Sequence, residues 1–216
     1  NNYQSTLRVA KACIEVDACL IALSSTSVYG TQKDQVDENC SEADLQPQSP
    51  YATTKLKEEE LIANLSKDKG LKAIHCRFGT IFGASQGMRF HTAVNKFCWQ
   101  AVMNQPISVW STAYDQKRPY LDLLDASRAI AFIIKNNIFD GQIYNVLTSN
   151  ATVRQVVDTI KEFVPNLEIE FVDNQIMNQL SYEVLCQRFE SKGFVFSGNM
   201  RRGIKETIDL LKYANK

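Results

Sequence analysis

The chain has 216 residues, of which 44% are apolar, and its 24 Lys and Arg residues balance its 24 Asp and Glu residues. A chain with zero net charge is not expected to bind nucleic acid or an anionic membrane surface non-specifically, and no apolar run is long enough to span a bilayer. The apolar content suffices for a buried core, and the length allows one or two compact units.

Cysteine and histidine usage narrow the class further. The six cysteines form no Cys-x-x-Cys pair, and several lie in apolar periodic segments, as buried thiols do. A reducing, cytoplasmic location is the simplest interpretation. His75 and His91 lie on different predicted elements, and no metal-ligand spacing is present, so no metal site is expected.

The first two predicted elements are a helix over 6–16 and a strand over 18–24. The apolar run Cys19-Leu-Ile-Ala-Leu23 ends abruptly in the hydroxyl-rich Ser24-Ser-Thr-Ser27, and Gly30 follows. A short apolar run of this kind is typical of a buried strand in a parallel sheet. Ligands of open α/β sheets bind beyond the carboxyl ends of the strands, so these hydroxyls stand where a ligand is expected.

A polar loop is predicted over 31–49, and a helix over 50–67 begins at Pro50, which suits a first helical turn. Tyr51 and Lys55 lie four residues apart on this helix and therefore share a face. A fixed ammonium beside a phenol favours the phenolate, which is a candidate general base for an alcohol. A plain surface pair is the alternative; the upstream strand end strengthens the chemical interpretation.

The rest of the chain alternates strands and helices, which indicates α/β architecture. Gly70, Gly141 and Pro165 stand where elements are expected to end. No internal repeat or low-complexity linker is visible. Strands are predicted over 71–77, 107–110, 120–123, 142–146 and 168–172, and helices over 90–103, 125–135, 152–163, 181–190 and 203–213.

Motifs along most of the chain carry a resemblance to a known family. Besides Ser24-Ser-Thr-Ser-Val-Tyr-Gly30 and Ser49-Pro-Tyr-Ala-Thr-Thr-Lys55, they are Asn1-Asn-Tyr-Gln-Ser-Thr-Leu7, Arg77-Phe-Gly-Thr-Ile-Phe-Gly83, Lys117-Arg-Pro-Tyr-Leu-Asp-Leu-Leu-Asp125 and Ile143-Tyr-Asn-Val146. The chain resembles the extended short-chain dehydrogenase/reductases of the nucleotide-sugar epimerase/dehydratase group. Together these motifs are specific for the superfamily and much less specific for the substrate.

The resemblance implies an α/β fold, namely part of a Rossmann-type doubly wound parallel sheet with a smaller α/β substrate-binding lobe. Residues 1–85 would be the C-terminal part of the NAD-binding domain, and 86–216 mainly the substrate lobe, with 118–147 returning to the sheet. The family's Gly-rich pyrophosphate turn is absent, because the glycines from Gly79 to Gly87 have the wrong spacing. We interpret the chain as the C-terminal part of a longer protein; a degenerate protein without its cofactor site is the alternative.

By the resemblance, NAD is the cofactor and carries the hydride chemistry. Tyr51, as phenolate, would take the proton of a sugar hydroxyl. Lys55 would favour that phenolate and bond the nicotinamide ribose. Ser25 would hydrogen-bond the reacting oxygen; a capped strand end is its structural alternative. The cofactor-binding positions implied by the resemblance are Asn1, Ser24, Tyr51, Lys55 and Gly79.

The residues after the catalytic position bear on the reaction type. Family 4,6-dehydratases carry Asp-Glu where this chain has Thr26 and Ser27, and neither hydroxyl can serve as a carboxylic acid or carboxylate base. Dehydration by that route is therefore not expected. The resemblance favours NAD-dependent epimerisation of a nucleotide sugar, of the UDP-hexose 4-epimerase type, through a transient keto intermediate. A reductase or decarboxylase of the same family, or a cofactor-less non-catalytic relative, is the alternative.

Substrate contacts are also implied by the resemblance. Arg118 aligns with a family Arg that contacts the diphosphate, and a guanidinium suits bidentate phosphate binding; a surface ion pair is the plainer alternative. Thr80 stands where the family commonly has Asn, and Pro119 replaces the usual Asp, which leaves the sugar open. The implied substrate-binding positions are Thr26, Thr80, Arg89, Asn95 and Arg118. The aromatic residues expected in the core are Phe90, Phe97, Trp99 and Trp110. In the family, the strand that carries Trp110 often packs beside the nucleotide base, which is the alternative for this residue.

The expected partner is a nucleotide sugar, with no nucleic acid and no membrane. In the family, the catalytic helix and its preceding neighbour often pair across a dimer. Helices 6–16 and 50–67 are therefore expected to form a homodimer interface.

Overall fold

A parallel sheet lies at the centre of the first part of the molecule. Its strands are β1 (Leu20–Ser25), β3 (Ala73–Phe78) and β7 (Ile143–Val146), in the spatial order β1-β3-β7. The computed structural model describes residues 1–30, 34–173 and 181–214. Every residue of the central strand β3 is buried, as a strand covered on both faces requires.

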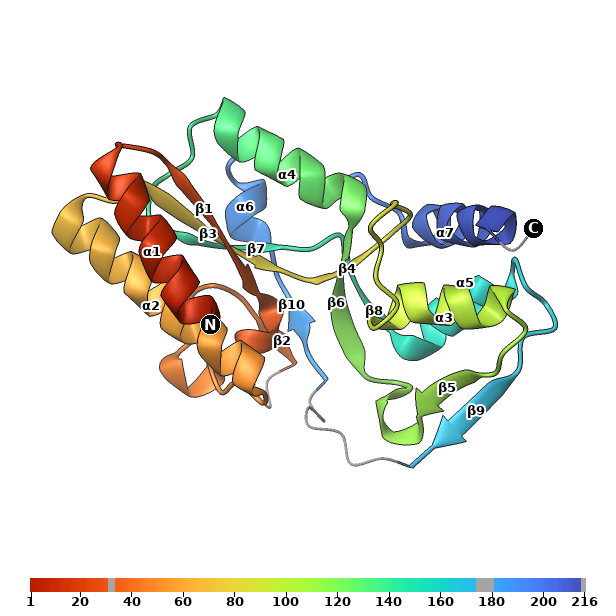
Figure 1. Ribbon diagram of the computed structural model, residues 1–216. Coiled ribbons are helices and arrows are strands. Elements are labelled where there is room, and N and C mark those ends of the chain that lie inside the picture. The colour runs from red at the N-terminus through yellow and green to blue at the C-terminus, as the bar shows by residue number, and fades with distance from the viewer. Residues whose placement is uncertain (31–33, 174–180, 215–216) are drawn as a thin grey trace.

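Helices cover both faces of this sheet. α1 (Asn2–Glu15) and α2 (Pro50–Lys69) lie side by side on one face, and α4 (Leu123–Lys135) lies on the other (Figure 1). The sheet is therefore doubly wound, which confirms the predicted α/β class. The core beneath α1 and α2 includes Ala10, Ile62 and Ala73, and the core beneath α4 includes Cys76, Leu121, Ala129 and Ile133.

The sequence around α2 explains where this helix begins and ends. The Ser49 side chain accepts a hydrogen bond from the backbone N–H of Ala52, and Pro50 occupies the first turn. Gly70 ends the helix with φ 69°, a left-handed conformation that glycine adopts readily. These signals place Tyr51 in the first turn of the helix, next to the carboxyl end of β1.

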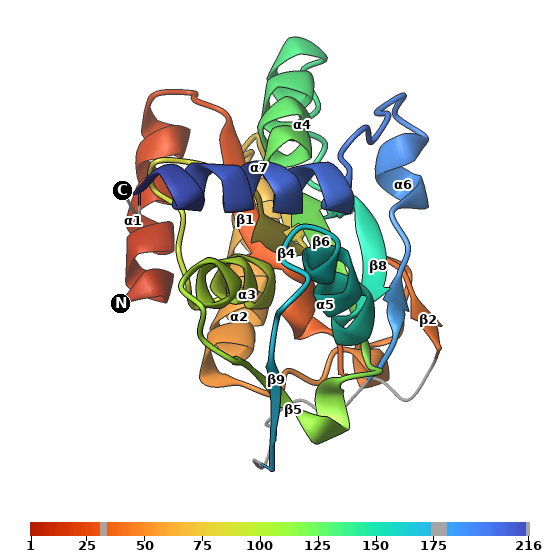
Figure 2. The same cartoon turned by 90° about the vertical axis from the view of Figure 1, so that its right-hand side faces the viewer.

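The second part of the molecule combines short strands with helices that pack beside them (Figure 2). A mixed sheet has the order β4-β6-β8, with β4 parallel and β8 antiparallel to β6. One apolar core joins its helices, with Phe82, Phe97, Tyr120, Val156 and Ile204 among its members. The elements are β4 (Thr80–Phe82), α3 (Ala93–Val102), β5 (Ile107–Trp110), β6 (Lys117–Asp122), β8 (Ser149–Thr152), α5 (Val153–Lys161), β9 (Ile169–Val172) and α7 (Met200–Ala214), and β5 pairs with β9.

The C-terminal stretch passes back over the first part before it enters α7. β10 (Glu183–Val184) pairs with β2 (Gln35–Val36), and α6 (Gln187–Glu190) follows. Phe189 and Phe194 are buried in the core beneath α4. This route connects the two parts again, in addition to the direct passages from β3 to β4, from β6 to α4 and from β7 to β8.

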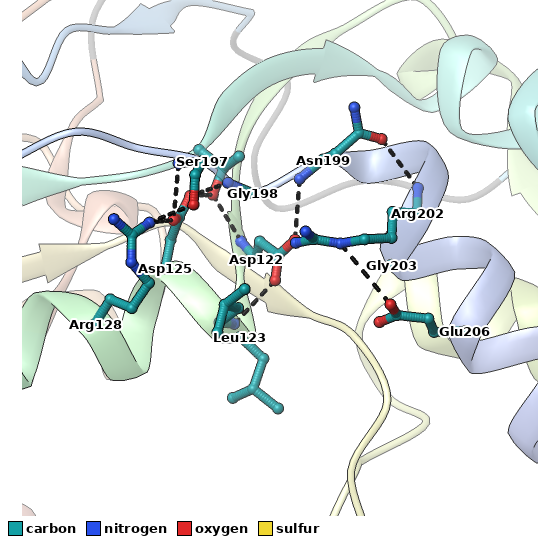
Figure 3. Close-up of polar contacts among 12 residues, drawn as sticks. Asp122, Leu123, Asp125, Arg128, Ser197, Gly198, Asn199, Arg202, Gly203 and Glu206 are labelled. Carbon is teal, nitrogen blue, oxygen red and sulfur yellow. Dashed lines mark hydrogen bonds and ion pairs between the residues drawn. The ribbon is translucent and has the colours of Figure 1, made fainter.

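Two buried carboxylates hold the segment that leads into α7 (Figure 3). Asp125 accepts hydrogen bonds from the backbone N–H groups of Ser197 and Gly198 at 3.0 and 2.8 Å. Asp122 accepts one from the backbone N–H of Asn199 at 3.0 Å. A Cβ at Gly198 would lie 2.5 Å from Asp122 Cβ, so only glycine allows this close approach.

Several predicted elements differ from the observed ones. The predicted helix over 181–190 contains a two-residue strand and one helical turn, because its backbone pairs with β2 instead of with itself. β4 and β8 were not predicted, since β4 has only three residues and β8, with the sequence Ser-Asn-Ala-Thr, has only one apolar side chain. β1 was expected to be buried, yet it lies at the edge of the described sheet, and Leu23 is 46% exposed.

Candidate active site

A cleft of about 700 Å³ opens at the carboxyl ends of β1 and β3. The parallel register places Ser25 beside Phe78, so the hydroxyl-rich strand end and the turn after β3 lie next to each other. The first turn of α2 and the start of α3 complete the walls. The predicted residues that line the cleft are Ser24, Ser25, Tyr51, Lys55, Gly79, Thr80, Arg89 and Asn95.

Tyr51 and Lys55 face this cleft together. The Tyr51 side chain is exposed, and the Lys55 ammonium lies 5.8 Å from the centroid of its ring. Lys55 Nζ also bonds Glu58 Oε2 at 2.9 Å, and Glu58 is buried. A carboxylate that sequence reasoning did not single out therefore balances part of the charge that Lys55 brings to the cleft.

Ser25 is a strand-end cap as well as a cleft residue. Its Oγ accepts hydrogen bonds from the backbone N–H of Ser27 at 3.2 Å and from Ser27 Oγ at 2.9 Å. A hydroxyl has two acceptor positions and one proton to donate. Because Ser27 uses both acceptor positions, the Ser25 hydroxyl proton is the part that can reach a ligand oxygen.

Two other cleft residues also have structural roles. Asn95 is buried, and its Oδ1 accepts a hydrogen bond from the backbone N–H of Gly83 at 3.2 Å, which fixes the turn after β4. A Cβ at Gly79 would lie 3.0 Å from the Pro119 carbonyl oxygen. The glycine thus allows the end of β3 to pass close to β6, where the chain departs from the family pattern.

Other predicted site residues lie away from this cleft. Thr26 is 4% exposed, and its Oγ1 donates to the Phe78 carbonyl oxygen at 3.3 Å, so it does not line the cleft. The backbone turns into a short 3-10 helix at this residue, and that turn directs the side chain inward. Asn1 lines a separate surface groove between the start of α1 and α2, with Thr54 and Glu60.

Arg118 belongs to a second cleft of about 620 Å³ that shares Thr80, His91 and Thr92 with the first. Its Nη2 donates to Gln116 Oε1 at 2.7 Å. Burial lowers the pKa of its guanidinium, which is the cost of holding a cation in a partly desolvated position.

Trp110 lines this second cleft and is 45% exposed, so the core position expected for it is wrong. Along β5, Ile107 and Val109 point into the core, and the alternation of a strand turns Trp110 to the other side. Phe90 is also exposed, because it precedes α3, whereas Phe97 is buried in the core.

The two clefts share a positive character. Among the described residues that line them, none is Asp or Glu, and the cations include Lys55, Arg89, Lys96 and Arg118. Basic side chains in clefts whose described lining holds no carboxylate are suited to an extended anionic ligand, although Lys55 forms an ion pair with Glu58, which lines neither cleft. The pair of clefts can thus receive a molecule that carries phosphate groups.

Behind the first cleft lies a buried polar cluster that sequence reasoning missed. Ser24 Oγ donates to Glu59 Oε1 at 2.5 Å, and Arg77 pairs with Glu59 through Nη2 at 2.7 Å. One signal was present in the sequence: Arg77 ends a run that predicts a buried strand, and a buried charge requires a partner. Glu59, one helical turn after Lys55, was the nearest candidate partner for Arg77.

His75 is a further buried polar residue of β3, with 1% of its surface exposed. Neither ring nitrogen has a hydrogen-bond partner among the described residues. Burial lowers the pKa of its imidazole, so the ring is held neutral.

Two other features, a metal centre and a membrane-spanning helix, are absent from the described part of the chain. There, no group of three or more His, Cys, Asp and Glu side chains lies close enough together to hold a metal ion. No helix in the described ranges combines the length and apolar composition that a membrane span requires.

The residues present fit one end of a dinucleotide. Ser24, Tyr51, Lys55 and Gly79 lie together at strand ends that face an open cleft, where a nicotinamide and its ribose can enter. The chain contains no Gly-x-x-Gly-x-x-Gly turn, so these residues supply no pyrophosphate cradle.

Known structures share this architecture. The UDP-glucuronic acid 4-epimerase of Bacillus cereus, in complex with UDP-glucuronic acid and NAD, superimposes with a TM-score of 0.87 over 99% of this chain and 68% of its own, at 20% identity. A UDP-glucose 4-epimerase of Thermotoga maritima, with UDP-glucose, gives a TM-score of 0.84 over 98% and 69%, at 17% identity. At these identities the likeness establishes the fold.

Sequence relatives extend the comparison. A trifunctional UDP-glucose 4,6-dehydratase/UDP-4-keto-6-deoxy-D-glucose 3,5-epimerase/UDP-4-keto-L-rhamnose-reductase of Arabidopsis thaliana is 27% identical over 97% of this chain and 32% of its own length. An uncharacterized UDP-glucose epimerase of Bacillus subtilis is 29% identical over 75% and 50%. The chain thus spans about a third of the first of these relatives and half of the second.

A family model described as the NAD dependent epimerase/dehydratase family matches residues 1–146. That stretch includes the hydroxyl-rich strand end, the Tyr/Lys helix and the turn after β3. It covers well over half of the 216 residues. The chain belongs to the NAD dependent epimerase/dehydratase family.

Proposed function

We propose that this chain carries the catalytic and sugar-binding part of an NAD-dependent nucleotide-sugar epimerase of the UDP-hexose 4-epimerase type. One observation supports this most directly. The cleft at the ends of β1 and β3 brings Ser25, Tyr51 and Lys55 together, and it joins a second cleft lined by cations. An enzyme of this kind also needs a pyrophosphate-binding turn, which these residues do not include.

In the proposed reaction, the Tyr51 phenolate takes the proton of a sugar hydroxyl, and Lys55 stabilises that phenolate electrostatically. NAD, when bound, would supply the reversible hydride transfer at the same carbon. The Ser25 hydroxyl donates a hydrogen bond to the sugar oxygen that becomes the ketone oxygen. Tyr51 returns its proton to that oxygen when the sugar is reduced on its other face. Epimerisation follows, with no net oxidation.

The second cleft is the proposed site of the nucleoside diphosphate. Arg118 and Lys96 can neutralise phosphate charge, and Trp110 offers an exposed ring against which a base can stack. Arg89 would lie near the sugar, since it lines the first cleft. The described solved structures of 4-epimerases were obtained with UDP sugars, which is consistent with this arrangement.

Other chemistries of the family stay in view as second candidates. A reductase or decarboxylase would use the same Tyr51 and Lys55. Consumption of NAD(P)H would favour a reductase, whereas a tightly bound NAD with no net reduction would favour the epimerase. Dehydration stays unexpected in spite of the dehydratase named among the relatives, because Thr26 is buried and neither it nor Ser27 carries a carboxyl group.

Three further expectations belong to this proposal. Copies of the chain would pair through α1 and α2. Val9 of α1 and Val16, which directly follows that helix, are 52% and 73% exposed, as such an interface would need. A cytoplasmic location is supported by six free cysteines. Residues 1–85 would form the NAD-binding unit with 118–147, where β7 pairs with β3, and 86–216 the rest.

The decisive test is Tyr51→Phe in the complete enzyme. Removing the general base is expected to lower kcat for UDP-hexose interconversion about 10²–10⁴-fold while NAD stays bound. Steady-state kinetics and the absorbance of extracted NAD measure the two effects. Tyr213→Phe, at an exposed position of α7, is the matched control and is expected to leave kcat unchanged. Retained activity in Tyr51→Phe would remove Tyr51 from this role.

A further inference from the structure

We propose that Glu59 and Arg77 are positioning residues that set α2, and with it Tyr51 and Lys55, against the ends of β1 and β3. This inference rests on the proposed function only for its kinetic consequence. The geometry on which it stands is a buried ion pair directly behind the cleft.

The pair is bidentate and almost fully buried. Arg77 Nε donates to Glu59 Oε1 at 3.0 Å, and Nη2 donates to Oε2 at 2.7 Å. Their side chains are 2% and 7% exposed. Two parallel bonds between planar groups fix direction as well as distance, so Glu59 cannot turn away from β3 without losing both.

The surroundings of α2 make this pair more important than an ordinary surface contact. The buried residues of α2 are Ala52, Glu58, Glu59 and Ile62, so carboxylates make up half of them. Amphipathic helices are usually held in rotation by a continuous apolar stripe. In α2, Leu56, Ile62 and Leu65 pack in apolar clusters, but Glu58 and Glu59 interrupt the stripe. Directional polar bonds therefore contribute to fixing the rotation of α2 about its own axis.

The pair also reaches the cleft itself. Glu59 Oε1 accepts the Ser24 hydroxyl at 2.5 Å, and Ser24 lines the cleft. Glu59 lies one turn after Lys55 and two turns after Tyr51, on the same broad face of the helix. The rotation that directs Glu59 toward Arg77 is thus the one that directs Tyr51 and Lys55 toward the strand ends.

On the side away from α2, Arg77 is linked to β7 through the Tyr29 hydroxyl. Arg77 Nη1 donates to the Tyr29 hydroxyl at 3.0 Å, and that hydroxyl donates to Asn145 Oδ1 of β7 at 2.9 Å. The guanidinium carbon lies 4.9 Å from the centroid of the Tyr29 ring. Burial raises the pKa of Tyr29 to about 12, so it remains a hydroxyl that can donate. The chain of bonds links α2, β3 and β7.

Stability alone does not require such a pair. Buried ion pairs can often be replaced by apolar side chains of similar volume with little loss of stability. An apolar pair could not accept the Ser24 hydroxyl or fix a direction. Replacing the pair by apolar side chains should therefore separate its contribution to stability from its contribution to the position of α2.

The test compares Glu59→Met/Arg77→Met with the parent in the complete enzyme. The double variant is expected to keep a cooperative thermal transition, to lower kcat about 10²-fold, and to change KM less than about threefold, because a misplaced catalytic group impairs chemistry more than binding. Arg77→Lys, which keeps the charge but loses the bidentate bond, is the second variant. Arg77→Lys is expected to lower kcat by about 10-fold. If the double variant does not fold, the kcat of Arg77→Lys tests the positioning role instead.

The control is Arg201→Lys, in the exposed pair with Glu162, which is expected to behave as the parent. A folded double variant, or a folded Arg77→Lys, with parental kcat would overturn the proposal. A crystal structure of the double variant is independent of turnover: we expect α2 to be rotated and the Ser24 hydroxyl to be released. An unchanged α2 would overturn the positioning role even if the parent proved to have no epimerase activity, an outcome that would refute the proposed function alone.

Discussion

Buried carboxylates connect separate elements at two sites of this molecule, and their charges are balanced by different means. Behind the cleft, Glu59 is neutralised by the guanidinium of one fully buried arginine. At the start of α7, Asp122 and Asp125 bind the backbone N–H groups of residues 197–199 (Figure 3).

The cations near the second site are only partly buried. Arg128 and Arg202 are 40% and 41% exposed, so their ion pairs with Asp125 and Asp122 are screened by solvent. The first site thus depends on a charge pair inside the fold, and the second on a docked stretch of backbone. Loss of Arg77 at the first site leaves the Glu59 carboxylate buried without a cation. Loss of a carboxylate at the second site frees backbone N–H groups that can bond water again.

The largest effect is expected for Arg77→Met, which leaves the Glu59 carboxylate buried without its cation. Loss of about 3–5 kcal/mol from the free energy of unfolding is expected, measured by urea denaturation. Adding Glu59→Met should restore most of that loss. If the single and the double variants were equally destabilised, the trapped charge would not be the cause.

A smaller loss is expected for Asp125→Ala. The substitution removes the acceptor of Ser197 and Gly198, and of Thr148 Oγ1 at 2.9 Å, but the freed segment can rehydrate. Destabilisation of about 2–3 kcal/mol is expected, together with faster amide hydrogen exchange at residues 197–199. Asp125→Asn keeps one oxygen acceptor and should lie between this variant and the parent. Unchanged exchange in Asp125→Ala would show that the aspartate does not hold the segment.

Gly198→Ala tests the close approach at the same site. The added Cβ would meet Asp122 Cβ at 2.5 Å and Asp125 Oδ2 at 2.6 Å, so the docked segment must shift. About 1–3 kcal/mol of destabilisation is expected from thermal melting. Gly87→Ala is the matched control, since a Cβ there meets nothing within 4 Å, and no measurable loss is expected. Equal melting temperatures for the two variants would contradict this account.

The smallest effect concerns His75, a buried polar residue near Glu59. Its ring nitrogens have no hydrogen-bond partner among the described residues, unlike the carboxylates of the two sites. Its folded pKa is lowered by burial, so below about pH 6.5 the unfolded chain binds a proton that the folded chain does not. This group's contribution to stability is therefore present above about pH 6.5 and is lost as the pH falls below that value.

His75→Leu should remove part of the stability difference between pH 7.5 and pH 5.5, up to about 1 kcal/mol, as measured by urea denaturation at both values. At pH 7.5 the variant should be no less stable than the parent, since the two ring nitrogens have no hydrogen-bond partner among the described residues. An identical acid sensitivity in the two proteins would exclude His75 as its source.

Local patterns predicted the frame of the molecule well. The helix that carries Tyr51 and Lys55 begins at Pro50 as predicted and ends before Gly70, because capping and helix-start signals act over a few residues. The strand over 107–110 also matches. The two-residue strand at Glu183–Val184 was missed, because its pairing with β2 is made across a large separation in the sequence.

The sequence by itself determined the alternation of strands and helices, the hydroxyl-rich strand end and the helix with Tyr51 and Lys55. These features depend on spacing along the chain and on backbone geometry that repeats every two or 3.6 residues. Only the tertiary structure decided that Thr26 turns inward, that Trp110 faces a cleft, and that Arg77 finds Glu59. A buried charge shows in a sequence that a partner is needed, but the packing of distant elements decides which residue supplies it.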